Sequence, residues 1–237
     1  MTADRHERLA ATRVYLVASF GVDRAEQALA AAAAAARATV PGDADATSRG
    51  ARRPVVGAVQ LRCKGVPTET QRALLLRARQ LLPADTLLLV NDDLDAVFDK
   101  IGMPLADGVH LGREDTATLG LAGARERLGP DLLLGTSTRT LAEVDAALAA
   151  GADHVGFGAM ASSTTKSNTS PADPAELSRC LAAHPDLPIF PIGGLTPDTL
   201  HLVTATGCPR AAIGAAILNA PDPSEAARAC YELLTPD

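Results

Sequence analysis

The chain repeats one pattern eight times: a short apolar run, then a stretch with helical periodicity. The apolar runs span residues 13–20, 55–62, 86–91, 106–111, 131–137, 153–159, 188–194 and 210–216. The helical stretches span residues 23–38, 68–82, 93–101, 115–128, 140–151, 174–184, 197–206 and 222–234. Such alternation predicts parallel strands joined by crossover helices. Eight units in 237 residues predict a single (β/α)8 TIM barrel with a short N-terminal extension.

An open doubly wound sheet is the alternative fold. It would usually carry a glycine-rich turn after its first strand, whereas here that turn holds only Gly21. The stretch 39–54 is rich in Pro, Gly, Asp and Ser, so we expect a flexible insert before the second strand. No composition shift marks a domain boundary, and we predict one barrel domain over residues 1–237.

Charge and cysteine content narrow the functional classes. The net charge is −6 and there is no basic run, which argues against nucleic acid as a partner. The four cysteines lack C-x-x-C spacing and indicate a reducing compartment. The charged N-terminus has no apolar core like that of a signal peptide, and no stretch is apolar enough for a membrane span, so we expect a cytoplasmic protein.

Two carboxylates follow neighbouring strands of the predicted barrel. Active sites of such barrels lie at the carboxyl ends of the strands, where Asp92 and Asp115 are both expected. Carboxylate oxygens with room for water suit Mg²⁺ beside a phosphate. Each aspartate could instead cap a helix, because both precede helical stretches.

Cations form a second group at the strand ends. In "AVQLRCKG", Gln60, Arg62 and Lys64 fall on one face of the strand and would meet Lys166 at the barrel mouth. Together these cations could bind a polyphosphate. Lys64 and Lys166 could instead be solvated loop residues, but Arg62 ends an apolar strand, where an unpaired charge is costly.

Glycines form the third group. "IGGLTPD" and "AAIGAAI" place Gly194 and Gly214 at the ends of the last two strands, the usual phosphate site of these barrels. Simple turns are the alternative. The three groups predict two anion sites, one built on metal and cations, the other on backbone amides. One substrate would carry a diphosphate and the other a monophosphate.

Several motifs resemble, in order, those of thiamine phosphate synthase. They are "VQLRCKG", "NDDLD", "ADGVHLGRED", "LLLGTSTRTLAEVDAALAAGADHVGFGAM", "TTK" and "PIFPIGGLTPDT", and the resemblance covers residues 13–220. It implies a transferase of thiamine biosynthesis. Such an enzyme joins hydroxymethylpyrimidine diphosphate to thiazole phosphate, with Mg²⁺, and releases thiamine monophosphate and pyrophosphate. The partners are then small-molecule substrates, and a homo-oligomer is compatible with the sequence.

The resemblance also implies roles for individual residues. Asp92 and Asp115 would bind Mg²⁺, and Arg62, Lys64 and Lys166 would stabilise the departing pyrophosphate. The implied substrate-binding residues are Gln60, Asn91, Arg113, Ser137, Ser163, Thr165, Gly194, Gly214 and Ala215. The thiazole nitrogen carries no proton, so no general base is required and His110 and His154 need no catalytic role.

Some positions depart from the family pattern. Cys63 replaces a usual Glu, Arg113 replaces a commoner Gln, and Ala215 replaces a Ser. The loop "GAMASSTTK" lacks the Pro, Phe and first Thr that the family usually has. Two alternatives therefore stay open: a thiazole tautomerase-like isomerase, which needs no diphosphate site, and a non-catalytic barrel that binds thiamine precursors.

Overall fold

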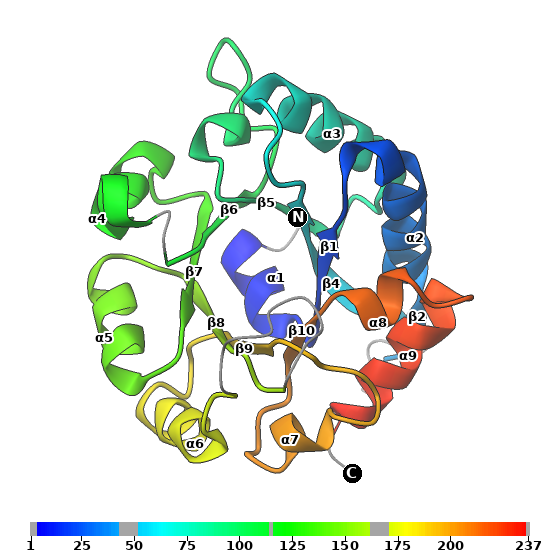
Figure 1. Cartoon of the computed structure of the whole chain (residues 1–237), viewed down its shortest axis with the longest axis vertical. Coiled ribbons are helices and arrows are strands. Elements are labelled where there is room, and N and C mark those ends of the chain that lie inside the picture. The colour runs from blue at the N-terminus through cyan, green and yellow to red at the C-terminus, as the bar shows by residue number, and fades with distance from the viewer. Residues whose placement is uncertain (1–3, 43–51, 114–115, 162–170, 236–237) are drawn as a thin grey trace.

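The computed structural model describes residues 4–42, 52–113, 116–161 and 171–235. Its centre is a closed barrel of parallel strands in the order β1-β10-β9-β8-β7-β6-β5-β4, as predicted (Figure 1). The barrel strands are β1 (Val14–Ser19), β4 (Val56–Arg62), β5 (Leu87–Asn91), β6 (Gly108–Leu111), β7 (Leu133–Thr138), β8 (His154–Gly158), β9 (Ile189–Ile192) and β10 (Ala211–Ile213).

Helices surround the barrel and cover the outer face of its strands. They are η1 (Val22–Arg24), α2 (Ala25–Arg37), α3 (Thr68–Leu81), η2 (Leu94–Val97), α4 (Thr116–Leu128), α5 (Leu141–Ala149), α6 (Pro174–Ala183), α7 (His201–Thr204), α8 (Ala215–Leu218) and α9 (Pro223–Leu233). The alanines of α2 favour a helix and allow it to lie close to the barrel, where Ala32, Ala35 and Ala36 are buried. No helix in the described ranges has the length and apolar character to cross a bilayer.

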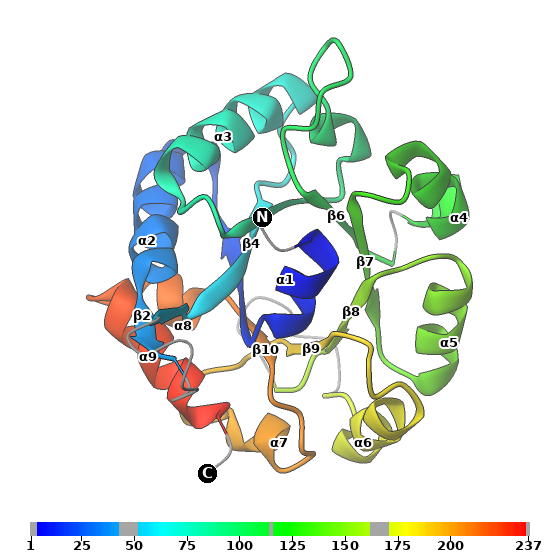
Figure 2. The same cartoon turned by 180° about the vertical axis from the view of Figure 1, so that it is seen from behind.

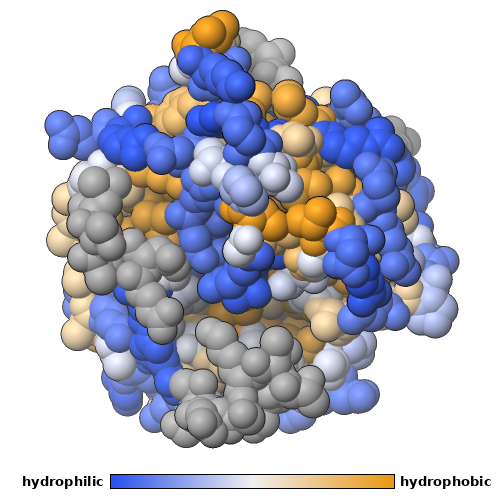
Figure 3. Space-filling model, turned by 45° about the horizontal axis from the view of Figure 1, so that its top comes forward, coloured by the Kyte–Doolittle hydropathy of each residue, from blue (hydrophilic) through white to orange (hydrophobic). Residues whose placement is uncertain are grey.

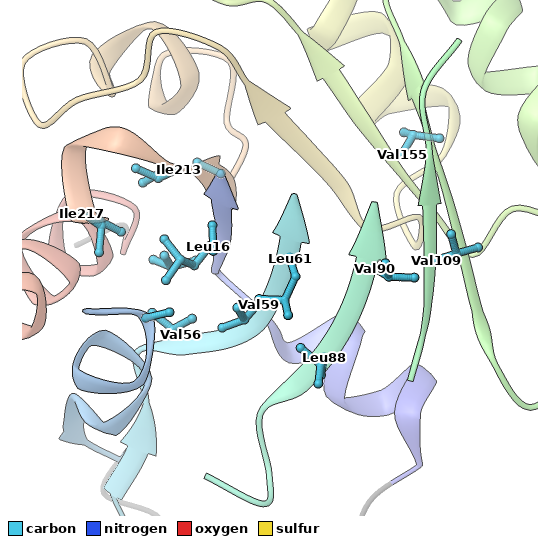
Figure 4. Close-up of a cluster of buried hydrophobic side chains, with 14 of the residues drawn as sticks. Leu16, Val56, Val59, Leu61, Leu88, Val90, Val109, Val155, Ile213 and Ile217 are labelled. Carbon is cyan, nitrogen blue, oxygen red and sulfur yellow. The ribbon is translucent and has the colours of Figure 1, made fainter. Parts of the chain in front are cut away.

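The strands divide the core into two layers. Residues such as Leu16, Val59, Leu61 and Val90 point outward into the layer between strands and helices (Figure 4). Their strand neighbours Tyr15, Val17, Ala58 and Leu89 fill the barrel interior, together with Leu87, Leu133, Phe190 and Ala212. Because strand side chains alternate, one face of each strand is left to line the barrel axis and the mouth above it.

A helix that the sequence analysis missed lies across the lower end of the barrel. Helix α1 (Arg5–Ala11) lies inside the ring of strands in both views (Figure 1 and Figure 2). Leu9 is only 1% exposed and packs into the interior cluster. Arg5 Nε donates to Asp107 Oδ1 at 2.8 Å, just before β6. The N-terminal extension therefore closes the end of the barrel opposite the mouth.

Three other predictions differ from the structure in whole or in part. The helix predicted over 93–101 is only the short 3₁₀ turn η2, because Asp99 Oδ1 accepts from the backbone N–H of Ile101 and Met103 and folds the chain into a tight loop. This loop projects from the ring (Figure 1), and its Ile101 and Met103 are exposed. The space-filling view shows a small hydrophobic patch at the top of the molecule (Figure 3). Of the loop predicted over 39–54, the two ends instead form the antiparallel strands β2 (Thr39–Pro41) and β3 (Arg52–Pro54), and residues 43–51 lie outside the described residues. The last apolar run ends at Ile213, so Ala215 opens α8 and is not a strand residue.

Candidate active site at the mouth of the barrel

The last residues of β4 bring polar groups onto the interior face of the barrel. Gln60 is 3% exposed, and its Nε2 donates to the Tyr15 hydroxyl at 3.4 Å. Two residues further, Arg62 Nη1 donates to Ser19 Oγ, at the end of β1, at 3.0 Å. Leu61 packs in the outer layer. The predicted alternation is confirmed, and it places the amide below the mouth and the guanidinium at its rim.

Asp92 occupies a constrained position directly after β5. Its φ is +66°, a left-handed conformation that Asp and Asn adopt more readily than most residues. Its Oδ1 accepts from the backbone N–H of Gly112 at 2.9 Å, after β6. The Nζ of Lys64 lies 3.6 Å from Oδ2, which also contacts the Asn91 amide. The carboxylate therefore links the ends of three neighbouring strands and faces a cation.

The neighbouring Asp93, not Asp92, caps the following turn. Its side chain accepts from the backbone N–H of Ala96 at 3.0 Å and from Gln71 Nε2 at 3.0 Å. The cap that the sequence "NDD" could provide is therefore supplied by Asp93, and the alternative that Asp92 caps the helix is wrong. Asp92 keeps a carboxylate oxygen, Oδ2, on the side of Lys64 and Asn91.

Ser137 contacts the partly buried His110, which in turn contacts the buried His154. His110 Nε2 lies 3.1 Å from Ser137 Oγ, and His110 Nδ1 lies 3.5 Å from His154 Nε2. Gly135 separates the two rings in register, and a Cβ there would lie 2.2 Å from the His154 ring. Burial lowers the pKa of His110 to about 4, although Asp92 opposes the shift, and burial also lowers the pKa of His154. Both rings are neutral at pH 7.

His110 is a site residue to which the sequence analysis gave no role. Its contact with Ser137 makes it a positioning group that holds the hydroxyl at the end of β7. A signal was present in the sequence: "GVHL" and "DHVG" put one histidine in each of two strands, and the strand between them carries Gly135 at the position that pairs with both. The two histidines can be recognised as neighbours only when the register of the strands is known.

The predicted cation Arg113 lies at the rim after β6. Its Nη1 is 3.6 Å from Glu143 Oε1, at the start of α5, and its side chain is half exposed. The structure therefore places this cation on the β6–β7 side of the mouth, whereas Arg62 and Lys64 lie on the β4–β5 side.

The glycines predicted to bind phosphate end β9 and β10. Gly193 and Gly194 both have positive φ, at +100° and +65°. A Cβ at Gly193 would lie 2.5 Å from the Ala159 side chain. The carbonyl of Gly194 accepts from Thr199 Oγ1 at 3.0 Å, which fixes this turn. Gly214 precedes α8, so the amides of Ala215 and its neighbours belong to a first helical turn, where helix N–H groups have no partner within the helix.

Part of the predicted site cannot be placed. Asp115, Ser163, Thr165 and Lys166 lie outside the described residues. Within the described ranges no group of three or more His, Cys, Asp or Glu side chains could hold a metal ion. The donors that are described, the Asp92 carboxylate and the Asn91 amide, are hard oxygen ligands. They fit an ion such as Mg²⁺, which is usually bound through one or two carboxylates plus substrate phosphate.

Comparison with known proteins gives one consistent result. The thiamine monophosphate synthase family model matches residues 14–217. The thiamine-phosphate synthase of Anaeromyxobacter dehalogenans is 41% identical over 174 residues, which cover 72% of this chain and 73% of that protein. The synthase of a Synechococcus species is 38% identical over 162 residues; the match covers 66% of this chain but only 45% of that longer protein.

A solved structure has the same fold. Thiamine phosphate pyrophosphorylase from Pyrococcus furiosus superposes with a TM-score of 0.71. The superposition covers 96% of this chain and 97% of that one, at 24% sequence identity. At this identity the likeness supports the barrel fold alone.

Proposed function

The chain belongs to the thiamine monophosphate synthase family and is a transferase of the thiamine phosphate synthase type. We propose that the active site at the mouth of its barrel joins hydroxymethylpyrimidine diphosphate to thiazole phosphate. The products are thiamine monophosphate and pyrophosphate. This assignment of the site rests on one observation: Lys64 contacts Asp92 at the ends of neighbouring strands, and Arg62 lies at the end of the same strand as Lys64.

The diphosphate lies against the β4–β5 side of the mouth in this proposal. Arg62 presents a planar guanidinium that can bind two phosphate oxygens, and Lys64 supplies a compact charge. Asn91 and Asp92 would hold Mg²⁺ together with Asp115, and Mg²⁺ when bound would neutralise charge on the diphosphate oxygens. Lys166, Ser163 and Thr165 would complete the diphosphate site from the loop after β8.

The pyrimidine lies over Ser137, held in place by His110. The thiazole phosphate lies against backbone N–H groups of Gly194, Gly214 and Ala215, on the β9–β10 side of the mouth. Arg113 would add a cation from the β6 side. The departures at Cys63 and Ala215 remain compatible with this arrangement. Cys63 is a buried thiol whose pKa is raised by burial, with Asp23 nearby, and Ala215 still offers its amide.

The reaction requires bond breaking and charge stabilisation, but no proton transfer. The C–O bond between the pyrimidine methylene and the diphosphate breaks, and its electron pair leaves with pyrophosphate. The thiazole nitrogen then donates its lone pair to the methylene carbon. Arg62 and Lys64 stabilise the charge that develops on the leaving group. Neutral His110 can position Ser137 without competing as a base.

A turnover assay tests the proposal. The protein is incubated with both substrates and Mg²⁺, and thiamine monophosphate and pyrophosphate are quantified, with circular dichroism to verify folding. Formation of both products in equal amounts is expected. Folded protein that binds the precursors without product would instead favour a non-catalytic barrel, and isomerisation of a thiazole carboxylate phosphate without Mg²⁺ would favour the tautomerase alternative.

We also propose a cytoplasmic location. Each of the four cysteines is a free, buried thiol, which is compatible with a reducing compartment.

A further inference from the structure

A second hollow opens at the end of the barrel opposite the mouth, with a volume of about 500 Å³. It lies among the residues that precede or begin β1, β4, β5 and β10, so it is separated from Arg62 by most of the length of β4. Its charged and aromatic lining residues are Arg8, Arg13, Arg53, Asp85, Arg210 and Tyr231. Arg8, Arg13 and Arg210 thus bring three positive charges to a lining that contains one carboxylate, that of Asp85.

Backbone carbonyls hold three of these arginines in place. Arg8 Nε donates to the Asp85 carbonyl at 3.1 Å. Arg13 Nη1 donates to the Leu234 carbonyl at 3.2 Å, and Arg210 Nη1 to the Ala10 carbonyl at 2.8 Å. A carbonyl fixes a guanidinium but does not neutralise it. In the part of the chain that the structure describes, none of these three arginines forms an ion pair with a carboxylate.

Two observations show that the charge in this hollow is unbalanced. Arg8 Nη2 is buried and has no hydrogen-bond partner among the described residues. The pKa of Arg210 is lowered chiefly by burial, and the charge of Arg13 adds to the shift against the opposing effect of Cys208. Cations that are partly removed from water and lie close to one another are destabilising unless an anion joins them.

We propose that this hollow binds a small phosphorylated anion with at least two negative charges. Guanidinium groups present paired donors that match phosphate oxygens, and several approach the hollow from different elements. Its volume lies in the range of small-molecule sites. The Tyr231 ring lies 5.7 Å from the Arg13 guanidinium carbon and gives one wall an apolar, aromatic face. The ligand would thus be larger than inorganic phosphate alone.

The antiparallel pair of β2 and β3, called the β2–β3 arm below, contributes to the wall of this hollow. Arg53 and Pro54 belong to β3, on the arm that separates the first and second βα units, and both line the hollow. Arg210, ahead of β10, also lines the hollow. A ligand would therefore contact segments from both ends of the chain, together with the helix α1 that closes the barrel. This inference does not depend on the reaction at the mouth.

Calorimetric titration with tripolyphosphate, in buffer free of Mg²⁺, tests the proposal. An Arg62→Gln/Lys64→Gln background weakens binding at the mouth, and loss of the remaining binding when a lining arginine is also replaced assigns that binding to the second hollow. We expect one tripolyphosphate per chain in that background. Adding Arg13→Gln should weaken binding at least about tenfold, the effect of losing one charge-assisted hydrogen bond. Titration with inorganic phosphate should give weaker binding than tripolyphosphate.

Two further variants make the result decisive. Arg37→Gln is the matched control, because Arg37 also donates to a backbone carbonyl, that of Leu81, but does not line the hollow; its affinity should equal that of the background. Arg53→Gln changes an exposed residue of the arm, so it remains informative if Arg13→Gln fails to fold, and it should also weaken binding. The proposal is overturned if the background binds no tripolyphosphate, or if Arg53→Gln binds it as tightly as Arg37→Gln does.

Discussion

Asp92 and Asp93 are adjacent carboxylates with different surroundings, and the sequence alone could not assign them. Both belong to "NDD" after an apolar run, and either could bind a cation or cap the next turn. The left-handed backbone at Asp92 turns its carboxylate toward Gly112 and Lys64, while Asp93 points to Ala96 and Gln71. Such a change of direction depends on one φ angle, which residue type and periodicity do not determine.

We expect Asp92→Asn to lower turnover at least about 100-fold, because it removes the charge proposed to bind Mg²⁺ while Asn still tolerates the left-handed backbone. The melting temperature should stay within about 2 °C of wild type. Steady-state kinetics over a range of Mg²⁺ concentrations and a thermal melt measure the two effects. Asp92→Ala is the less clean variant, because alanine is strained at positive φ and would also lose the contact with Gly112.

The adjacent Asp93→Ala should behave in the opposite way. Loss of the cap should cost about 1 kcal/mol and lower the melting temperature by about 2–4 °C, with a normal dependence of rate on Mg²⁺. If Asp93→Ala abolishes the response to Mg²⁺ and Asp92→Asn does not, the assignment of the two carboxylates is wrong.

At the scale of elements, long periodic segments were predicted well and short ones were not. The apolar runs of β4, β5 and β7 and the long α3 stand out, because burial on one or both faces dictates their residue types. In contrast, α8 has only four residues, and α1 reads "RHERLAA" with a single deeply buried side chain. Their positions are set by packing against the finished barrel, which a local sequence pattern does not record.

Helix α1 should contribute to stability chiefly through Leu9. We expect Leu9→Ala to lower the free energy of unfolding by about 2–4 kcal/mol, since it empties space inside the barrel. Glu7→Ala changes an exposed residue on the same helix and should have little effect. Urea unfolding followed by circular dichroism compares the two variants. Equal, small effects would mean that α1 does not pack into the interior in solution.

The segment between β2 and β3 should be dispensable for catalysis. These strands pair at the N-terminal end of β4, with Thr39 opposite Pro54, and are therefore remote from the mouth. We expect removal of residues 43–50, with a short glycine-containing turn in their place, to leave kcat and KM within about twofold. A steady-state assay decides the point. A collapse in kcat would mean that this segment shapes the active site.

At the scale of the whole molecule, the pair of His110 and His154 inside the barrel links folding stability to pH. His110 has a pKa of about 4 in the folded chain and about 6.5 when unfolded, so between these values the unfolded chain binds more protons. The stability contributed by the neutral ring is full above about pH 6.5 and is lost as the pH falls toward 4.

Urea unfolding at pH 7.5 and pH 4.5 should therefore show that His110→Gln reduces the difference between the two conditions by about 2–3 kcal/mol. The exposed His201 provides the control, and His201→Gln should retain the wild-type difference. An unchanged difference in His110→Gln would show that this ring is solvated or already charged in the folded protein.

Closure of the barrel also constrains how the chain can be made. Strand β1 pairs with β4 on one side and with β10 on the other, where Val14 lies opposite Ala211. During synthesis, β1 thus keeps one unpaired edge until β10, about 200 residues later, has also been made. Contacts between residues so far apart in the sequence form slowly. Until they form, the unpaired strand edge can associate with other chains. Translation speed and chaperone supply should therefore affect the yield of this enzyme more than its final stability would suggest.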